Sequence, residues 1–448
     1  MNNRYIYIII SILSVCMIAC SDNELVGEGY DDTLVRIRPI VKEGIEYDIT
    51  TTRSTGPFEK WSDDPSHWLN ANFRTFALLD HNRVYNGARD YSKSDIEIYN
   101  QLMRIKNANG ELKFYDENGQ EEEKYYSPWR TRRYNFFTYF TDAPDTFKLD
   151  GKSEPGVLKT NITINGRQDV MHGFAYHTDQ DLTNLISQMP DNDETKLFTN
   201  GNEGRDYLYS GMAGNRGIHP QFHLKHLLSR FDLKVQGVPT GKNNEKKYSY
   251  LQVIINEVNI KAPAKGTLYI ARSNWQDEAS YNRAVDNGEI LTWEGEKKYN
   301  LEVIQQDMQN VSVVDVDFNS LQQQLLDNGI VSRTQPYFHV NSEEPKDMCL
   351  PVMLPAMTES VEIELKYTYV LYYYDTESQQ WKVNLELTKG KQEHSIHKLS
   401  LPVEQRPFKP GSKYTIWMKI YGREEVSIDV LNGEIWEQAG TIDWQTED

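Results

Sequence analysis

Three pairs of histidines come nearest, by type and spacing, to a metal site or an acid–base centre. They are His172 with His177, His223 with His226, and His394 with His397. A metal site needs several ligands that converge, each oriented by a further contact. Residues three apart on an extended strand point to opposite faces, so the two closer pairs do not converge. We therefore expect no metal site and no cofactor.

The usual motifs of catalysis are also missing. The sequence contains no Gly-x-Ser-x-Gly turn, no glycine-rich phosphate loop with a lysine, and no His-Glu-x-x-His helix. Acidic residues are abundant enough to imagine a carboxylate pair for glycoside hydrolysis, but nothing in their order selects one pair. The sequence predicts a protein that is not an enzyme, with an extracellular hydrolase as the least favoured alternative.

One cysteine has the setting of a covalent modification. Cys20 follows Ala19 and an apolar run, and Arg4 is the only charged residue before it. This order is typical of an export signal, and the run is shorter than the roughly 20 apolar residues that span a bilayer. It resembles the lipobox of bacterial lipoproteins, in which residues 1–19 would be removed and Cys20 would carry acyl chains, palmitate among them. The alternative is an ordinary secretory signal with a chance cysteine.

Composition limits the partners. The net charge is −18, and it becomes −19 once residues 1–19 are removed, because Arg4 is the only charge among them. A strongly acidic body argues against nucleic acid and against anionic lipid surfaces. Cys349 is the only other cysteine in the mature chain, so no disulfide can form within it, and stability must come from apolar burial.

Alternating apolar and polar residues predict many half-buried strands. The apolar stripes are Val35 and Ile37; Phe231, Leu233 and Val235; Val361, Ile363, Leu365 and Tyr367; Val383, Leu385 and Leu387; Tyr414, Ile416, Met418 and Ile420; and Val426, Ile428 and Val430. Helical spacing is confined to residues 179–189, 319–328 and, as a third possibility, 95–105. A glycine cluster and a proline at 211–220 predict a domain boundary between residues 215 and 216. The pattern indicates a mainly β chain of sandwiches.

Five short segments, in order along the chain, carry a family resemblance. They are Thr-Arg-Ser-Thr-Gly at 52–56, the aromatic strand 134–140, Phe-His-Leu-Lys-His-Leu-Leu-Ser-Arg-Phe at 222–231, Pro-Gly-Ser-Lys-Tyr-Thr-Ile at 410–416, and Trp444. With the lipobox ahead of them, they resemble the fimbrillin superfamily of Gram-negative surface lipoproteins, the subunits of type V pili. One departure is the aromatic strand, which lacks its closing proline and continues as Thr-Asp-Ala-Pro.

The resemblance implies two tandem transthyretin-like β-sandwich domains with a few short helices, here 20–215 and 216–448. It also implies an outer-membrane lipoprotein on the cell surface or in a fimbrium, with other fimbrial subunits as partners. In the family, a protease cuts after an arginine behind the first strand. That strand then leaves with the lipid peptide, and C-terminal strands of the next subunit fill the groove.

Carried onto this sequence, the removable strand is 33–41, with the stripe Val35, Ile37 and Val41. The candidate processing site is Arg53, in a run of Thr, Ser and Gly; a solvated arginine in a linker is the alternative reading. The candidate donor residues are Val426, Ile428, Val430, Ile435 and Ile442. Strand addition repairs unpaired amides and an exposed apolar trough together.

Two function classes follow from these observations. The first is a fimbrial subunit or fimbrillin-like surface adhesin, with its stalk, tip or anchor position and any host or bacterial ligand left open. The alternative is a surface glycan-binding lipoprotein. That alternative requires exposed Trp and Tyr clustered on one face, although most aromatic residues of a β-rich chain pack in cores and across strands.

Overall fold

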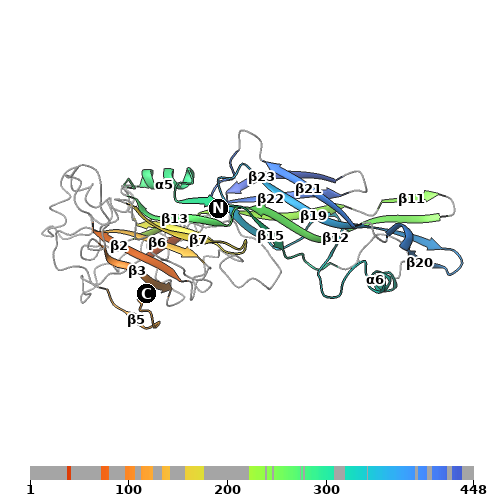
Figure 1. Cartoon of the computed structure of the whole chain (residues 1–448), viewed down its shortest axis with the longest axis horizontal. Helices are drawn as coiled ribbons and strands as arrows, with labels where there is room; N and C mark the ends of the chain where they lie inside the picture. Colours follow the sequence, from red (N-terminus) through yellow and green to blue (C-terminus); the bar gives the residue numbers. More distant parts are fainter. Residues whose placement is uncertain are drawn as a thin grey trace, which may run out of the picture.

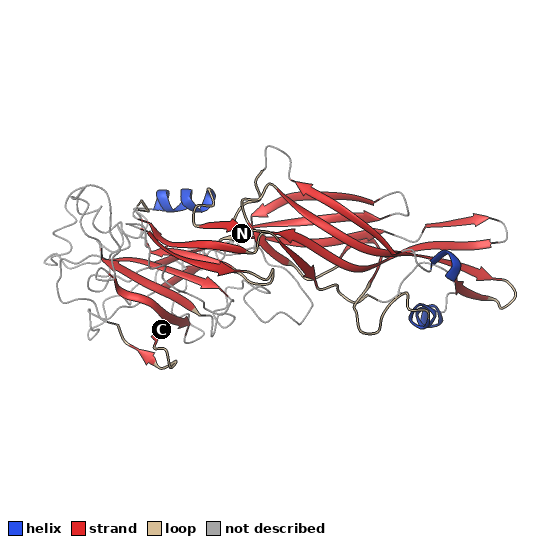
Figure 2. Ribbon diagram, viewed as in Figure 1, coloured by secondary structure: helices blue, strands red, loops and turns tan. Residues whose placement is uncertain are grey.

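The computed structural model describes residues 38–41, 72–79, 96–105, 112–124, 134–141, 157–175, 221–237, 240–244, 247–272, 274–275, 278–306, 318–340, 342–388, 392–400, 406–420 and 426–435. The chain is mainly β, with antiparallel pairing predominant and a few short helices (Figure 2). Its strands form two lobes that follow one another along the long axis of the molecule (Figure 1).

The N-lobe is built on an eight-stranded sheet. Its order is β1 (Arg38–Val41), β9 (Gln221–His226), β8 (Val170–Ala175), β6 (Tyr134–Thr141), β2 (Phe73–Leu79), β3 (Ile96–Ile105), β4 (Leu112–Tyr115) and β5 (Glu121–Glu122). A three-stranded sheet packs against it, in the order β14 (Leu291–Glu294), β13 (Lys265–Arg272) and β7 (Val157–Thr163). Helix α5 (Glu278–Asp286) lies between β13 and β14 in the chain.

The C-lobe has two facing sheets. One runs β17 (Ser342–Asp347), β10 (Leu228–Gly237), β22 (Ser412–Ile420) and β23 (Val426–Ile435), with β18 (Val352–Pro355) also on β10. The other runs β11 (Thr240–Asn244), β12 (Lys247–Ala262), β19 (Ser360–Asp375) and β20 (Gln380–Val383). Strands β15 (Lys297–Leu301) and β16 (Phe338–Val340) also pair with β12, and β21 (Gln392–Ser400) pairs with β19. Helices α6 (Phe318–Asp327) and α7 (Leu385–Thr388) complete the lobe.

The predicted stripes form the core between these sheets. Phe231, Leu233 and Val235 on β10 are buried, as are the four stripe residues of β22 and the four that open β19. They belong to one apolar cluster that continues into the N-lobe through Phe137 and Phe174. A one-sided stripe buries its apolar face and leaves the other face to polar residues, which explains why alternation predicted these strands.

Two sequence predictions are wrong. Residues 95–105 do not form a helix, since residues 96–105 are strand β3. Asn100 has a φ of 47°, and the pairing with β2 changes register between Ile98 and Gln101, so this bulge interrupts the alternation of the strand. Ile98, Leu102 and Met103 are all buried, at spacings of four and five residues rather than two. The stripe that continues through Leu385 and Leu387 is also wrong, because β20 ends at Val383 and α7 follows.

The other helices compare with the sequence predictions in three ways. The helix predicted at 319–328 is confirmed as α6, whose Leu321 and Leu325 pack on the outer face of β12 and β19. The predicted segment 179–189 lies outside the described residues. Helix α5 was not predicted; its Tyr281 is buried against β8. In the described part of the chain, no helix is long and apolar enough to cross a bilayer.

Strands that are neighbours in the chain lie in different lobes at the junction, and one late strand joins the N-lobe. Strands β9 and β10 are consecutive in the chain but lie in different sheets, with Leu227 between them. Strands β13 and β14 come from the C-terminal half of the sequence, yet β13 pairs with β7 of the N-lobe. The boundary between residues 215 and 216 stays a prediction.

Candidate functional site

Strand β1 lies at one edge of the N-lobe sheet. It pairs in parallel with β9, with Arg38 opposite Gln221 and Val41 opposite Leu224. Among the described residues, no strand pairs with its other edge. An edge strand held on one side can leave without dividing the sheet, because its departure breaks a single ladder. Of the predicted strand 33–41, residues 38–41 are described; Val35 and Ile37 lie outside the described residues.

The neighbour of β1 presents apolar side chains to one face of the sheet. Phe222 and Leu224 on β9 are buried. The register places Val41 beside Leu224 and Pro39 beside Phe222. The predicted stripe keeps a period of two in the sequence, but Val35 and Ile37 lie outside the described residues. Loss of β1 would leave the backbone groups of β9 on this side unpaired, beside the buried Phe222 and Leu224.

The segment that would have to be cut lies between β1 and β2. Val41 ends β1, and Phe73 begins β2. Arg53 falls between these two residues in the sequence and lies outside the described residues, as does Cys20. A break anywhere in 42–72 would separate β1, together with everything that precedes it, from the remainder of the chain.

Strand β23 carries four of the five candidate donor residues. Val426, Ile428, Val430 and Ile435 lie in β23, which pairs antiparallel with β22 at the edge of its sheet. Ile442 lies outside the described residues. Strand β23 thus repeats, in the C-lobe, the edge position that β1 has in the N-lobe.

The described histidines have structural settings. The two ring nitrogens of His172 lie 2.9 Å from the Tyr281 hydroxyl and 2.8 Å from the Ile270 carbonyl oxygen, which joins β8 to α5 and β13. Burial lowers the pKa of His172 to about 4, so the ring is neutral at physiological pH. The Nδ1 of His226 lies 2.9 Å from the carboxylate of buried Asp169.

The remaining groups that could do chemistry are metal ligands and the thiol of Cys349. The described residues contain no group of three or more His, Cys, Asp or Glu able to hold a metal ion. Cys349 is buried in the core, and burial raises the pKa of its thiol, which disfavours the reactive thiolate. His177 lies outside the described residues, and for His223, His394 and His397 only the backbone is described.

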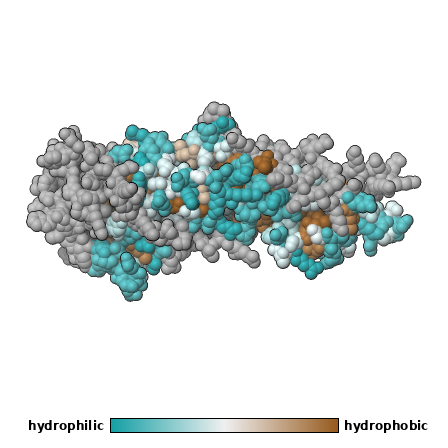
Figure 3. Space-filling view, viewed as in Figure 1, coloured by the Kyte–Doolittle hydropathy of each residue, from teal (hydrophilic) through white to brown (hydrophobic). Residues whose placement is uncertain are grey.

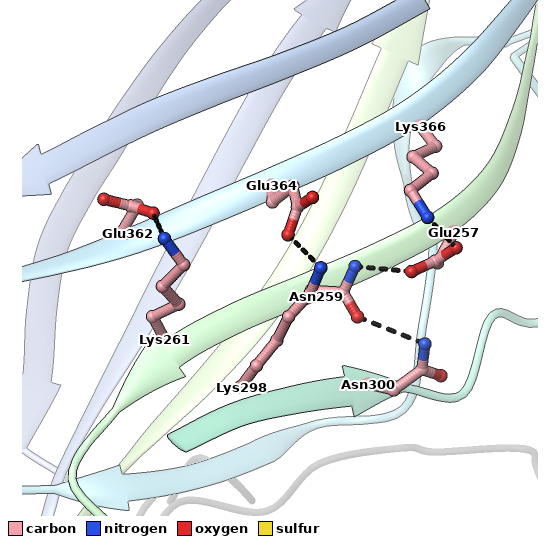
Figure 4. Close-up of polar contacts among 8 residues, drawn as sticks. All are labelled: Glu257, Asn259, Lys261, Lys298, Asn300, Glu362, Glu364 and Lys366. Atoms are coloured by element: carbon pink, nitrogen blue, oxygen red, sulfur yellow. Dashed lines mark hydrogen bonds and ion pairs between the residues drawn. The ribbon is translucent and has the colours of Figure 1, made fainter. Parts of the chain in front are cut away.

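Sequence reasoning missed a charged ladder on the outer face of the C-lobe sheet (Figure 4). Lys261 faces Glu362, Lys298 reaches Glu364, and the Lys366 ammonium lies 2.6 Å from Glu257. Hydrogen bonding from Asn259, followed by that from Lys366, lowers the pKa of Glu257.

The ladder follows the strand register. Lys261 and Glu362 are directly opposite each other on β12 and β19, and so are Glu257 and Lys366. Opposite charges directly across a sheet each contribute roughly 0.2–1 kcal/mol, and a slip by one residue would place them on the core face. The ladder therefore fixes the pairing of two long strands.

The comparisons with known proteins give structures only. No protein-family model matches the chain, and no curated protein sequence matches it. The fold is similar to the crystal structure of a fimbrial protein from Bacteroides vulgatus, at 13% identity, with 90% of this chain and 99% of that chain covered and a TM-score of 0.42. It is also similar to the fimbrial anchor protein Mfa2 from Porphyromonas gingivalis, at 8% identity, with coverages of 88% and 97% and a TM-score of 0.28. Solved structures of fimbrial proteins are thus among those to which this chain is similar.

Proposed function

We propose that the protein is a fimbrial subunit or fimbrillin-like surface adhesin, tethered to the outer membrane through a lipid on Cys20. In this proposal it assembles with other subunits by donor-strand exchange after cleavage at Arg53. The observation that carries the proposal is the position of β1, a short strand at a sheet edge that pairs only with β9 among the described strands.

The chemistry of the exchange follows from that position. Strand β1 is separated from β2 by the segment that contains Arg53, so one cut frees it from the sandwich. Its departure would leave the β1 edge of β9 unpaired and the apolar side chains of Phe222 and Leu224 without their neighbour. A strand with an apolar stripe, supplied by another subunit, would restore both the hydrogen bonds and the burial.

The donor in this proposal is β23 with the residues that follow it. Its stripe of Val426, Ile428 and Val430 continues to Ile435, and Ile442 lies beyond. Burying four or five such side chains contributes roughly 1.5–3 kcal/mol each before the entropy of ordering is subtracted. That gain is large enough to favour exchange over an open edge.

The test is limited digestion of the mature chain with an arginine-specific protease. We expect a cut at Arg53, release of the N-terminal peptide, and a ladder of polymers on a gel run without boiling. The variant Arg53→Gln should remain an uncut monomer, whereas the matched control Arg83→Gln should behave like the wild type. A chain that is cut at Arg53 and still never polymerises would contradict the assembly role.

The glycan-binding alternative lacks a supporting observation in the described part of the molecule. The exposed large apolar side chains there are Tyr99 on β3, Tyr373 on β19 and Ile396 on β21. The two tyrosines lie in different lobes, so they do not make one stacking platform. On the face drawn in Figure 3, the described surface is largely hydrophilic, with small separate apolar patches. We therefore put forward the assembly role alone.

A further inference from the structure

Strands β1 and β22 occupy the same edge of one long strand, β9 followed by β10. The Leu227 amide donates to the Val170 carbonyl oxygen of β8, 2.8 Å away. The next residue, Leu228, accepts a hydrogen bond from the Gly411 amide, at 2.9 Å, just ahead of β22. Consecutive residues of a strand direct their backbone groups to opposite sides, so β22 lies on the side away from β8. This is also the side on which β1 pairs.

Strands β1 and β22 pair with successive parts of this edge and do not overlap. Lys413 of β22 is opposite Arg230, and β22 begins one residue earlier at Ser412, level with Ser229. Val41 ends β1 opposite Leu224. Within the described residues, β1 is therefore the only strand beside this edge on the N-lobe side of the junction.

Strand β23 points toward the position that β1 fills. It runs antiparallel to β22, and its last residue, Ile435, is opposite Ser412. The chain thus leaves β23 level with Ser229, directed toward the start of β9, one strand farther out than the β1 position. The sequence continues through Gly440 and Trp444, which lie outside the described residues.

Residues 436–444 are enough to reach the β1 position. The level of Leu224 is five residues beyond Ser229, and that of Gln221 is eight beyond, or about 17 and 27 Å at ~3.4 Å per residue. A tail that continues straight brings Gly440 level with Leu224 and Asp443 level with Gln221. The inward shift is one strand spacing, about 4.8 Å, which residues 436–439 can span.

We propose that, once β1 has left, residues 440–444 of the same chain pair with β9 and cap the open edge. This inference rests on the strand exchange proposed above and adds a regulatory step to it. The cap is antiparallel, whereas β1 is parallel, and antiparallel pairing is slightly more stable per residue. A tethered tail has an effective concentration near the millimolar range, so it competes strongly with the donor of a dilute second subunit.

The capped chain is a processed monomer that does not polymerise at once. Ile442 and Trp444 alternate with Thr441 and Asp443, so the tail carries an apolar stripe of its own. A growing polymer must displace this stripe before a neighbour's strand can enter. Self-capping thus keeps cut subunits soluble and makes elongation depend on subunit concentration.

The experiment measures hydrogen exchange at β9 in the cut chain. Strand alternation directs the Phe222 and Leu224 amides to the β1 side, so these two report on its occupancy. The test variant carries two substitutions, Thr441→Pro and Ile442→Pro. In a strand, one of two consecutive amides faces β9, and proline has no amide hydrogen. The double variant therefore removes the hydrogen-bond donor to β9 in either register. The matched control is Thr446→Pro with Glu447→Pro. A chain that ends at Gly440 is a second test of the same step.

All chains are cut at Arg53 and held dilute enough to stay monomeric. We expect the two amides to exchange at least about tenfold more slowly in the wild type and the control than in both tail variants. The tail variants should also polymerise with a shorter lag. If the two amides exchange hydrogen equally fast in every cut chain and polymers still form, self-capping is contradicted. The proposed donor-strand exchange between subunits would be unaffected by that result. Retention of the N-terminal peptide by the cut chain would overturn both.

Discussion

Replacing His172 by glutamine should flatten the loss of stability that accompanies acidification. His172 lies in the N-lobe core, where its ring contacts the Tyr281 hydroxyl and the Ile270 carbonyl oxygen. Burial lowers its pKa to about 4, from an ordinary value of 6.5. Between about pH 4 and pH 6.5 the unfolded chain binds a proton at His172 that the folded chain does not bind, so acidification favours unfolding.

The size of the effect follows from the interval between the two pKa values. Above pH 6.5 the ring is neutral in both states, and His172 adds no pH dependence. Between pH 6.5 and 4 each pH unit removes up to ~1.4 kcal/mol, so the contribution of His172 reaches about 3 kcal/mol near pH 4. Below pH 4 the folded chain also binds the proton, and the loss stops growing.

Urea unfolding at a series of pH values measures this contribution. The difference between pH 7 and pH 4 should be smaller by about 3 kcal/mol in His172→Gln than in the wild type. The control Tyr281→Phe keeps the titrating ring and removes its partner, so it should lower stability at every pH by about 1–2 kcal/mol and retain the wild-type pH dependence. Identical pH profiles for the wild type and His172→Gln would refute the reasoning.

Two further predictions concern the C-lobe, and both are measured by thermal or urea unfolding. Leu325→Ala should lower the free energy of unfolding by about 2–4 kcal/mol, because this fully buried side chain packs α6 on the outer face of β12 and β19. The control Leu326→Ala, at a partly buried neighbour, should lower it by less than half as much. Equal losses at the two positions would contradict this packing. Lys298→Gln should cost about 1–2 kcal/mol, because it removes the cation beside the nearly buried Glu364. The exposed pair is the control: Lys346→Gln, beside Glu344, should change stability by less than about 0.5 kcal/mol, and an equal effect at both sites would count against the ladder.

The sequence predicted the strands whose two faces meet different surroundings. The stripes around Phe231, Val361 and Tyr414 have one face in the core, so their period of two is visible in the residue order. Strand β3 was misassigned because the bulge at Asn100 changes the phase of burial, and a bulge has no signature in alternation alone. The end of the strand at Val383 was missed because Leu385 continues the same period into α7.

Pairing between distant segments could not be predicted from local pattern. The segment 222–231 reads as one continuous motif in the sequence, and Leu227, at which the chain passes from one sheet to the other, is apolar like Leu224 and Leu228. The pairing of β13 with β7 joins residues about a hundred positions apart, and α5 becomes recognisable only once Tyr281 meets His172. For the candidate site, the sequence predicted a first strand, but its parallel pairing with β9 and its shared edge with β22 required coordinates.

Native mass spectrometry of the mature chain cut at Arg53 tests the central claim most directly, because it reports whether β1 can leave an otherwise folded sandwich. We predict that the N-terminal peptide separates under native conditions and that the remaining body, residues 54–448, is detected without it, both as a monomer and within polymers. Detection of that body only with the peptide still bound, and loss of the peptide only on unfolding, would contradict a removable first strand.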